Sequence, residues 1–257
     1  MKIIIPISCS FLLIGWIASC QPSISNEERL EQLAKKVTVR IFSANPSDRV
    51  GGSGVLIDSQ ENQYLVITND HVVSNRQLVY QIQTFDGKTY PARILSPRQS
   101  YRENDLALLK FQAPFPYKIL KIPSKPRIFK DDPVLAGGFP FSDDLEQTTH
   151  FYSTQGKVTM VLDQPFIGGY GIGYTNLVRG GMSGGPVINQ KGELLGINGM
   201  DKNPLFGNPY IFPDGKTVSE AAWREVSQLS WSIPSQTIQQ FIQKYREPGA
   251  KNAPESR

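Results

Sequence analysis

The sequence contains little cysteine and little histidine. Its two cysteines, Cys9 and Cys20, both lie in the first 20 of 257 residues. The rest of the chain therefore has no disulfide, no cysteine metal site and no thiol nucleophile, so its stability must come from its core. The two histidines are His71 and His150, so any histidine-dependent chemistry rests on one of these two residues.

A strong net charge is also missing. The formal charge is +4, and the basic residues are scattered along the chain instead of clustered. Nucleic-acid-binding proteins present a basic patch or stripe, so we expect no nucleic-acid partner. With 39% hydrophobic residues, the length suits one large domain or two small domains that share a cleft.

The only long apolar segment is at the N-terminus. Met1-Lys2 precedes a mostly apolar run at residues 3–18, which is shorter than the roughly 20 residues of a membrane-spanning helix. The run predicts an export signal, with a retained membrane anchor as the alternative. It ends in Ile17-Ala18-Ser19-Cys20, which resembles a bacterial lipobox and implies lipidation of Cys20; ordinary signal-peptidase cleavage is the competing outcome. We therefore expect a periplasmic or cell-surface protein that contacts the membrane only through this lipid or signal anchor.

From residue 37 onward, short β-rich runs alternate with turns rich in glycine and proline, which is typical of an antiparallel barrel or sandwich. Polar residues 58–62 predict one turn, and Asp86-Gly87 predicts a β-hairpin. Two aperiodic segments, 112–133 and 201–221, predict a connection and a long loop. The predicted strands are VTVRIF, GGSGVLID, QYLVIT, QLVYQIQTF, KTYPARIL, DLALLKF, PVLAGGF, STQGKVTMVL, GPVIN, ELLGIN and LSWSI.

Helices are predicted only near the two ends of the chain. Ser25 and Glu28 have the spacing of a capping box, and an amphipathic pattern follows them. Near the other end, Ser235 is expected to cap a helix. The apolar face of this second helix comprises Ile238, Phe241, Ile242 and Tyr245.

The segment GMSGGPV, residues 181–187, places the hydroxyl of Ser183 among glycines and also fits the G-x-S-x-G pattern of α/β-hydrolases. A serine nucleophile needs a base within hydrogen-bond reach, and in α/β-hydrolases that histidine follows the serine. Both histidines precede Ser183, and the glycine-proline run after it leads into a hairpin instead of a helix. Two possible triads remain. In chain order, one is His71–Asp105–Ser183 and the other is Asp105–His150–Ser183. His150 lies in a polar stretch with no apolar strand to hold it, so we favour His71.

Six motifs in register carry a resemblance to a known family: GSGVLI, TNDHVV, NDLALLK, GMSGGPV, GELLGIN and SWSIPS. Over about Val37 to Tyr245 the chain resembles the trypsin-like, chymotrypsin-fold serine peptidases, most closely the bacterial Deg/Htr-type protease domain, here without a PDZ segment. The resemblance implies two six-stranded antiparallel β-barrels with the active site between them, and a C-terminal helix. The implied organisation is a signal peptide at 1–20, a spacer and short helix at 21–36, an N-terminal barrel at 37–115, a connection at 116–133, a C-terminal barrel and helix at 134–246, and a disordered tail at 247–257.

The resemblance also implies a serine endopeptidase that acts on polypeptides without a cofactor or metal. Ser183 would attack the peptide carbonyl, His71 would transfer the proton, and Asp105 would orient His71. The backbone N–H groups of Gly181 and Ser183 would form the oxyanion hole. A silent peptide-binding domain is one alternative. Another is a protease kept latent, with flexible loops at 163–181 and 201–221, until substrate or a partner binds.

Two residues depart from the family pattern. Met182 stands where zymogen-type relatives carry an acid that pairs with a freed N-terminus, so we expect no activation by that ion pair. Asp70 lies beside His71 and is expected to face away from Ser183, because successive side chains on an extended segment point apart.

The resemblance locates the primary specificity pocket at Leu177, Val178 and Arg179 and on the strand around Asn198 to Asp201. Leu177 at the base of this pocket favours an apolar or small side chain before the cut. Arg179 or Asn198 would instead favour an acidic one, and a purely structural role in loop packing is the alternative for both residues.

Overall fold

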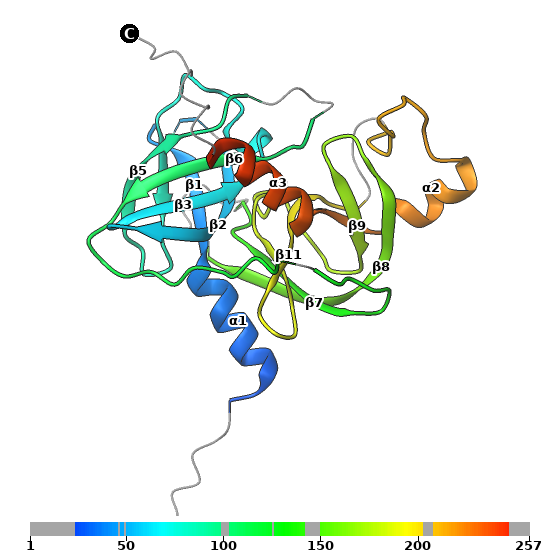
Figure 1. Cartoon of the computed structure of the whole chain (residues 1–257), viewed down its shortest axis with the longest axis horizontal. Coiled ribbons are helices and arrows are strands. Elements are labelled where there is room, and N and C mark those ends of the chain that lie inside the picture. Colours follow the sequence, from blue (N-terminus) through cyan, green and yellow to red (C-terminus); the bar gives the residue numbers. More distant parts are fainter. Residues whose placement is uncertain are drawn as a thin grey trace, which may run out of the picture.

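The computed structural model describes residues 24–45, 47–48, 50–98, 103–124, 126–141, 150–202 and 208–246. It contains two closed antiparallel barrels of six strands each, side by side, as the resemblance implied (Figure 1). The predicted signal segment, Cys20 and the tail from residue 247 lie outside the described residues. Among the helices that the structure describes, none is long and apolar enough to cross a membrane.

The first barrel closes in the order β1-β2-β3-β6-β5-β4. The β2–β3 turn is only Glu61-Asn62, both at positive φ, so β2 continues through residues 58–60, which were predicted as turn. The hairpin predicted at Asp86-Gly87 is confirmed, with Gly87 at φ 81°. The strands are β1 (Thr38–Ser43), β2 (Gly51–Gln60), β3 (Gln63–Thr68), β4 (Tyr80–Gln83), β5 (Thr89–Ile94) and β6 (Ala107–Gln112).

The second barrel closes in the order β10-β11-β12-β9-β8-β7. β9 was not predicted, because the glycines of YGIGY weaken a strand signal; all five residues are nevertheless buried between β8 and β12. The expectation of a flexible loop over 163–181 is therefore wrong for the end of β8 and for β9. The strands are β7 (Pro133–Gly138), β8 (Tyr152–Phe166), β9 (Tyr170–Tyr174), β10 (Pro186–Asn189), β11 (Leu194–Met200) and β12 (Ser230–Pro234).

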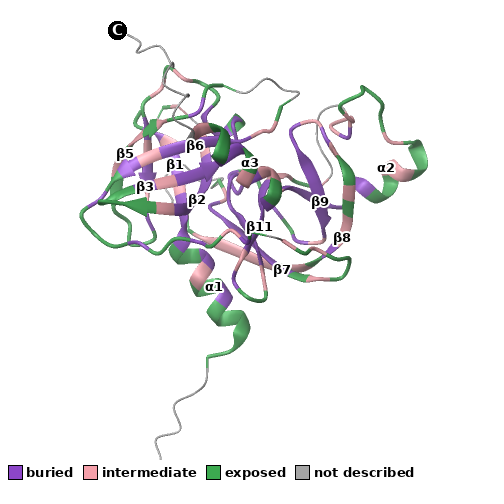
Figure 2. Ribbon diagram, in the orientation of Figure 1, coloured by how far each residue is buried: buried purple, intermediate pink, exposed green. Residues whose placement is uncertain are grey.

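Helix α1 (Asn26–Val37) leads into the first barrel but packs against the second. Its predicted capping box is present, with Ser25 Oγ accepting from Glu28 N at 3.1 Å and Glu28 Oε2 accepting from Ser25 N at 2.9 Å. Arg29 donates to the Gln190 carbonyl at the β10–β11 turn. The buried residues of this helix are Leu30, Ala34 and Val37, and Figure 2 shows buried stretches in purple along it. α1 therefore ties the two barrels together.

The connection predicted at 112–133 loses Gln112 to β6 and Pro133 to β7. Its other described residues form no helix or strand, but they are bonded to both barrels. Leu120 N donates to Leu56 O of β2 at 2.8 Å, and Lys121 O accepts from Leu194 N of β11 at 3.0 Å. These bonds give the connection a fixed path across both barrels.

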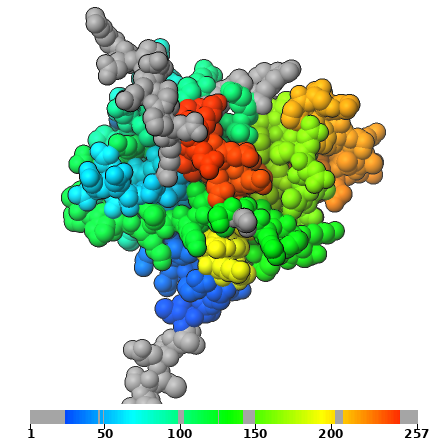
Figure 3. Space-filling model, viewed as in Figure 1, coloured from blue at the N-terminus to red at the C-terminus, as the bar shows by residue number. Residues whose placement is uncertain are grey.

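The C-terminal helix α3 (Ser235–Arg246) is confirmed, with Ile238, Phe241 and Ile242 buried. Figure 3 shows α3, in red, at the centre of one face between atoms of the two barrels. The predicted cap is wrong, because Ser235 is the first helical residue and its hydroxyl has no partner in the described structure.

A short helix, α2 (Glu220–Val226), begins at the end of the segment that was predicted as a loop. Its cap is Ser219, whose Oγ accepts from Ala222 N at 3.2 Å. Trp223 packs edge-on against the buried Tyr210, with ring centroids 5.1 Å apart. The sequence pattern missed this helix because only one face of a seven-residue stretch packs on the barrel, which is too short for a periodicity to stand out.

Candidate active site

His71 and Asp105 meet at one edge of the first barrel. His71 begins the 3-10 turn η1 (His71–Val73) after β3, and Asp105 precedes β6, the antiparallel neighbour of β3. Asp105 Oδ2 lies 2.6 Å from His71 Nδ1, and Oδ1 accepts from the His71 backbone N–H at 2.9 Å. Because an ionised carboxylate only accepts hydrogen bonds, His71 Nδ1 carries the proton and Nε2 is left as the basic nitrogen.

The second barrel reaches across to Asp105 through the β8–β9 turn. Gly168 O accepts from Asp105 N at 2.9 Å, and the hydroxyl of Tyr170 donates to Asp105 Oδ2 at 2.5 Å. Sequence reasoning missed Tyr170, because no family motif covers this turn. Its only local signal is a tyrosine directly after two glycines.

Ser183 lies in the loop between β9 and β10, and a residue of the first barrel holds this loop. Ser53 on β2 donates from its backbone N to Ser183 O at 2.8 Å and from its Oγ to Gly181 O at 2.9 Å. Gly184, at φ 86°, passes so close to β2 that a Cβ on it would lie 2.0 Å from Ser53 O. Sequence reasoning singled out the glycines but missed the part played by Ser53.

Gly52 separates the Ser183 loop from the His71 turn. A Cβ on Gly52 would lie 2.9 Å from Ser183 O and 2.9 Å from Val72 Cγ2 in η1. The three predicted residues therefore gather at the junction of the barrels, with His71 exposing 47% of its side chain. Within the described residues no hydrogen bond joins the Ser183 hydroxyl to His71, so the nucleophile and the base are neighbours that are not yet bonded.

The two predicted oxyanion donors are oriented by the loop. Gly180 O accepts from Phe141 N at 2.8 Å. In a planar trans peptide the C=O and N–H point in opposite directions, so the Gly181 N–H points away from Phe141. In the described part of the chain, neither this N–H nor that of Ser183 has an acceptor. Gly181 adopts φ 92°, which favours glycine.

Each member of the His71–Asp105 pair stabilises the charged form of the other. Burial lowers the pKa of His71, but the charge of Asp105 and its hydrogen bond outweigh this effect and raise the pKa above 6.5. Burial raises the pKa of Asp105, but the charge of His71 and the hydrogen bonds from His71 and Tyr170 bring it below 3.8. Burial and the charge of Asp105 raise the pKa of Tyr170 well above 10, so its hydroxyl stays a donor.

Asp70 forms an ion pair with Arg76, and its charge also contributes to raising the pKa of His71. The extended backbone assumed for Asp70 is wrong, because it has helical angles, φ −64° and ψ −37°. The other histidine, His150, is exposed and lies two residues before the start of β8. Met182 is fully buried, and its sulfur accepts from Arg179 N at 3.4 Å.

The predicted specificity residues differ in exposure. Leu177 is 45% exposed, Val178 is buried, and the guanidinium of Arg179 lies 4.5 Å from the centre of the Tyr152 ring. Asn198 is fully buried, donating to Gly137 O and accepting from the Tyr174 hydroxyl. Asn198 thus supports the barrel wall and offers no exposed polar atom to a substrate, which corrects its predicted role as a polar contact.

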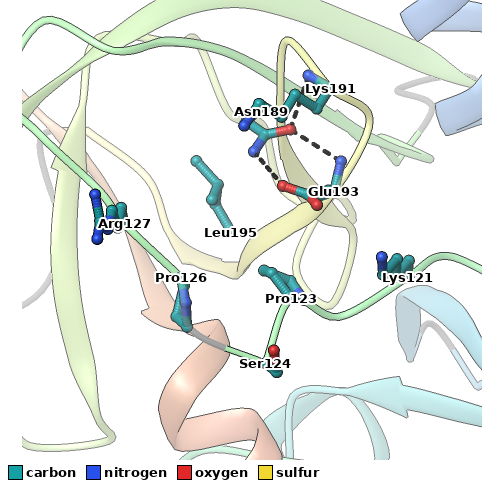
Figure 4. Close-up of a pocket in the computed structure, with 9 residues that line it drawn as sticks. All are labelled: Lys121, Pro123, Ser124, Pro126, Arg127, Asn189, Lys191, Glu193 and Leu195. Atoms are coloured by element: carbon teal, nitrogen blue, oxygen red, sulfur yellow. Dashed lines mark hydrogen bonds between the residues drawn. The ribbon is translucent and has the colours of Figure 1, made fainter.

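A pocket of about 290 Å³ lies elsewhere, between the connection and the β10–β11 hairpin, and contains none of the predicted catalytic residues (Figure 4). Its lining residues are Lys121, Pro123, Ser124, Pro126, Arg127, Asn189, Lys191, Glu193 and Leu195. The described residues contain no group of three or more histidine, cysteine or acidic side chains that could hold a metal ion.

Two six-stranded barrels, with a His–Asp pair and a serine in a glycine-rich loop at their junction, define the architecture of a two-barrel peptidase. The family model "Trypsin-like peptidase domain" matches residues 52–197, more than half of the chain, and the chain belongs to this family. The match includes His71, Asp105 and Ser183.

Similar curated proteins include three serine proteases. The chain is 27% identical to Serine protease HTRA1B of Danio rerio over 237 residues, which are 86% of this chain and 41% of that protein. It is 26% identical to Periplasmic serine endoprotease DegP of Escherichia coli (strain K12) over 77% of this chain and 36% of DegP. It is 30% identical to Serine protease HTRA1 of Xenopus laevis over 74% of this chain and 35% of that protein. The chain thus spans about two fifths or less of the length of these relatives.

Proposed function

We propose that the protein is a serine endopeptidase that hydrolyses peptide bonds through an acyl-enzyme. Ser183 Oγ attacks the peptide carbonyl carbon while its proton passes to His71 Nε2, and Asp105 stabilises the resulting imidazolium. The N–H groups of Gly181 and Ser183 bind the oxyanion. The proton then passes to the leaving amine, the peptide C–N bond breaks, and the acyl group stays on Ser183. Water, deprotonated by His71, then attacks the acyl carbonyl and releases the acid product and Ser183.

The observation that carries this proposal is the pairing of His71 with Asp105 beside a serine whose loop presents two N–H groups that have no acceptor among the described residues. A serine hydroxyl is a weak nucleophile unless a base accepts its proton, and His71 Nε2 is the basic nitrogen of this site. Hydrogen bonds from Phe141 and Ser53 to Gly180 O and Gly181 O hold the loop that carries these donors, which supports their role.

The test uses a serine-directed fluorophosphonate probe together with casein cleavage, on the mature protein and on Ser183→Ala. We expect labelling and cleavage by the wild type and neither by the variant. Equal cleavage by the Ser183→Ala variant would refute Ser183 as the nucleophile. Absence of both signals from the wild type under every condition would refute the enzyme assignment and leave the peptide-binding alternative.

One observation favours a second candidate, a protease that is latent until peptide binds. The Ser183 hydroxyl is not bonded to His71 in the described structure, although catalytic hydrogen bonds often tighten only when substrate is bound. Latency predicts fluorophosphonate labelling only after a peptide has been added. Labelling at the same rate without peptide would exclude it.

We further propose that the peptidase is exported and lipid-anchored at Cys20, on the sequence pattern alone. The test is incorporation of labelled fatty acid by the full chain and by Cys20→Ser. Incorporation that persists in the variant would contradict the assignment, and release of unlabelled wild type into the medium would favour ordinary secretion.

For specificity, the exposed Leu177 supports a preference for an apolar residue before the cut. The charge of Arg179 supports the competing preference for an acidic one. A peptide-library cleavage profile of the wild type and of Leu177→Ala separates the two. Loss of selectivity in the variant supports the first, and an unchanged acidic preference supports the second.

A further inference from the structure

The hydroxyl of Tyr170 occupies a special position at the candidate site. It comes from strand β9 of the second barrel, yet it donates to Asp105 Oδ2 in the first barrel at 2.5 Å. This is the same oxygen that lies 2.6 Å from His71 Nδ1. Tyr170 is only 6% exposed, so water does not compete strongly for this contact.

The surrounding backbone leaves room for this ring. A Cβ on Gly199 of β11 would lie 2.4 Å from the Tyr170 hydroxyl, and a Cβ on Gly168 would lie 2.8 Å from the ring. Gly168 also accepts the backbone N–H of Asp105 at 2.9 Å. Two glycines on separate elements thus admit a bulky side chain at the point where it reaches Asp105.

We propose that Tyr170 is a positioning residue that holds the Asp105 carboxylate, and through it the His71 ring, in the reactive orientation; this inference rests on the proposed function. With Oδ1 held by the His71 backbone and Oδ2 by Tyr170, the carboxylate is fixed at both oxygens. The donated hydrogen bond also offsets part of the negative charge that His71 feels, so it limits how far Asp105 raises the pKa of the ring.

The other titratable groups near the pair do not replace this contact. Asp70, which directly precedes η1, adds negative charge near His71 and is paired with Arg76. Tyr174, also on β9, lies near Tyr170, but its hydroxyl donates to Asn198. Burial also raises the pKa of Tyr174, which keeps it neutral.

The test replaces Tyr170 with phenylalanine, which removes only the oxygen, and uses Tyr174→Phe as the matched control. Both tyrosines are buried on one strand and donate one hydrogen bond to a side chain, but only Tyr170 reaches Asp105. For Tyr170→Phe we expect the acid limb of the kcat/KM profile to move up by roughly half to one pH unit, and the plateau to fall about tenfold. Tyr174→Phe should leave the limb in place. An unmoved limb in Tyr170→Phe, or equal shifts in both variants, would overturn the proposal.

A second readout does not depend on catalysis. In a Ser183→Ala background, NMR titration of the ring protons follows the only two histidines of the chain, and His150→Gln assigns them. Tyr170→Phe should raise the midpoint of His71 and leave that of His150 unchanged; an unchanged His71 midpoint refutes the role of Tyr170. Failure of the proposed function would show separately, as absent fluorophosphonate labelling of the wild type.

A second variant covers the case in which Tyr170→Phe does not fold. Gly199→Ala places a methyl group 2.4 Å from the present position of the Tyr170 hydroxyl, which is too close, so the hydroxyl must shift from its contact with Asp105. It should raise the His71 midpoint in the same direction while keeping the tyrosine itself. A folded Gly199→Ala protein with a wild-type midpoint would count against the proposal.

Discussion

Ser53→Ala should test how the first barrel holds the catalytic loop of the second. The Ser53 hydroxyl donates to Gly181 O at 2.9 Å and accepts from Phe139 N at 2.8 Å, and Ser53 is fully buried. Alanine would leave a buried carbonyl and a buried N–H without partners. Each such group costs about 1–3 kcal/mol, so we expect a loss of roughly 2–4 kcal/mol in the free energy of unfolding. Fluorophosphonate labelling should also slow, because the Gly181 carbonyl loses its anchor.

The assay is urea unfolding, with Ser232→Ala as the matched control. Ser232 is also fully buried in a strand, but its hydroxyl has no hydrogen-bond partner among the described residues. Removing it should therefore be neutral or stabilise by up to about 1 kcal/mol. If Ser53→Ala unfolds at the same urea concentration as the wild type, or is no less stable than Ser232→Ala, the proposed anchoring is refuted.

Further predictions concern the acid, the base and the glycine loop. Because the raised pKa of His71 keeps it protonated to higher pH, the acid limb of kcat/KM should have its midpoint above pH 6.5; a midpoint below 6 would contradict this. Asp105→Asn should remove most activity at pH 8 while Asp70→Asn keeps it, and the reverse result in casein cleavage would reassign the orienting acid. Gly184→Ala should destabilise by more than about 3 kcal/mol in urea, because its methyl meets a β2 carbonyl, whereas Gly87→Ala should cost only about 1–2 kcal/mol, since nothing lies within 4 Å of its Cβ. Equal costs for the two glycines would rule out the steric argument.

Local sequence signals predicted the elements whose cause is local. The capping box at Ser25 and the hairpin at Asp86-Gly87 depend on residues within a few positions of one another, and both are present. Ser235 shows the limit of such reasoning. A serine before an apolar helical pattern is a common cap, but here β12 runs directly into α3 and Ser235 is already helical.

Elements that are stabilised by distant contacts were missed. β9 is rich in glycine and forms because β8 and β12 bond it on both sides. Asn198 was expected to face the substrate from its place in the sequence. The register of β11 instead turns its amide toward Gly137 and Tyr174, inside the barrel.

The sequence by itself determined the order of the chemistry: two histidines, both before Ser183, and a glycine loop that admits positive φ. This was possible because residue identity and chain order constrain which base can serve a serine nucleophile. Only the tertiary structure decided that Ser53 holds the nucleophile loop and that Tyr170 reaches Asp105. These contacts join residues 128 and 65 positions apart across the two barrels, and such pairings depend on how the barrels pack, which no local pattern records.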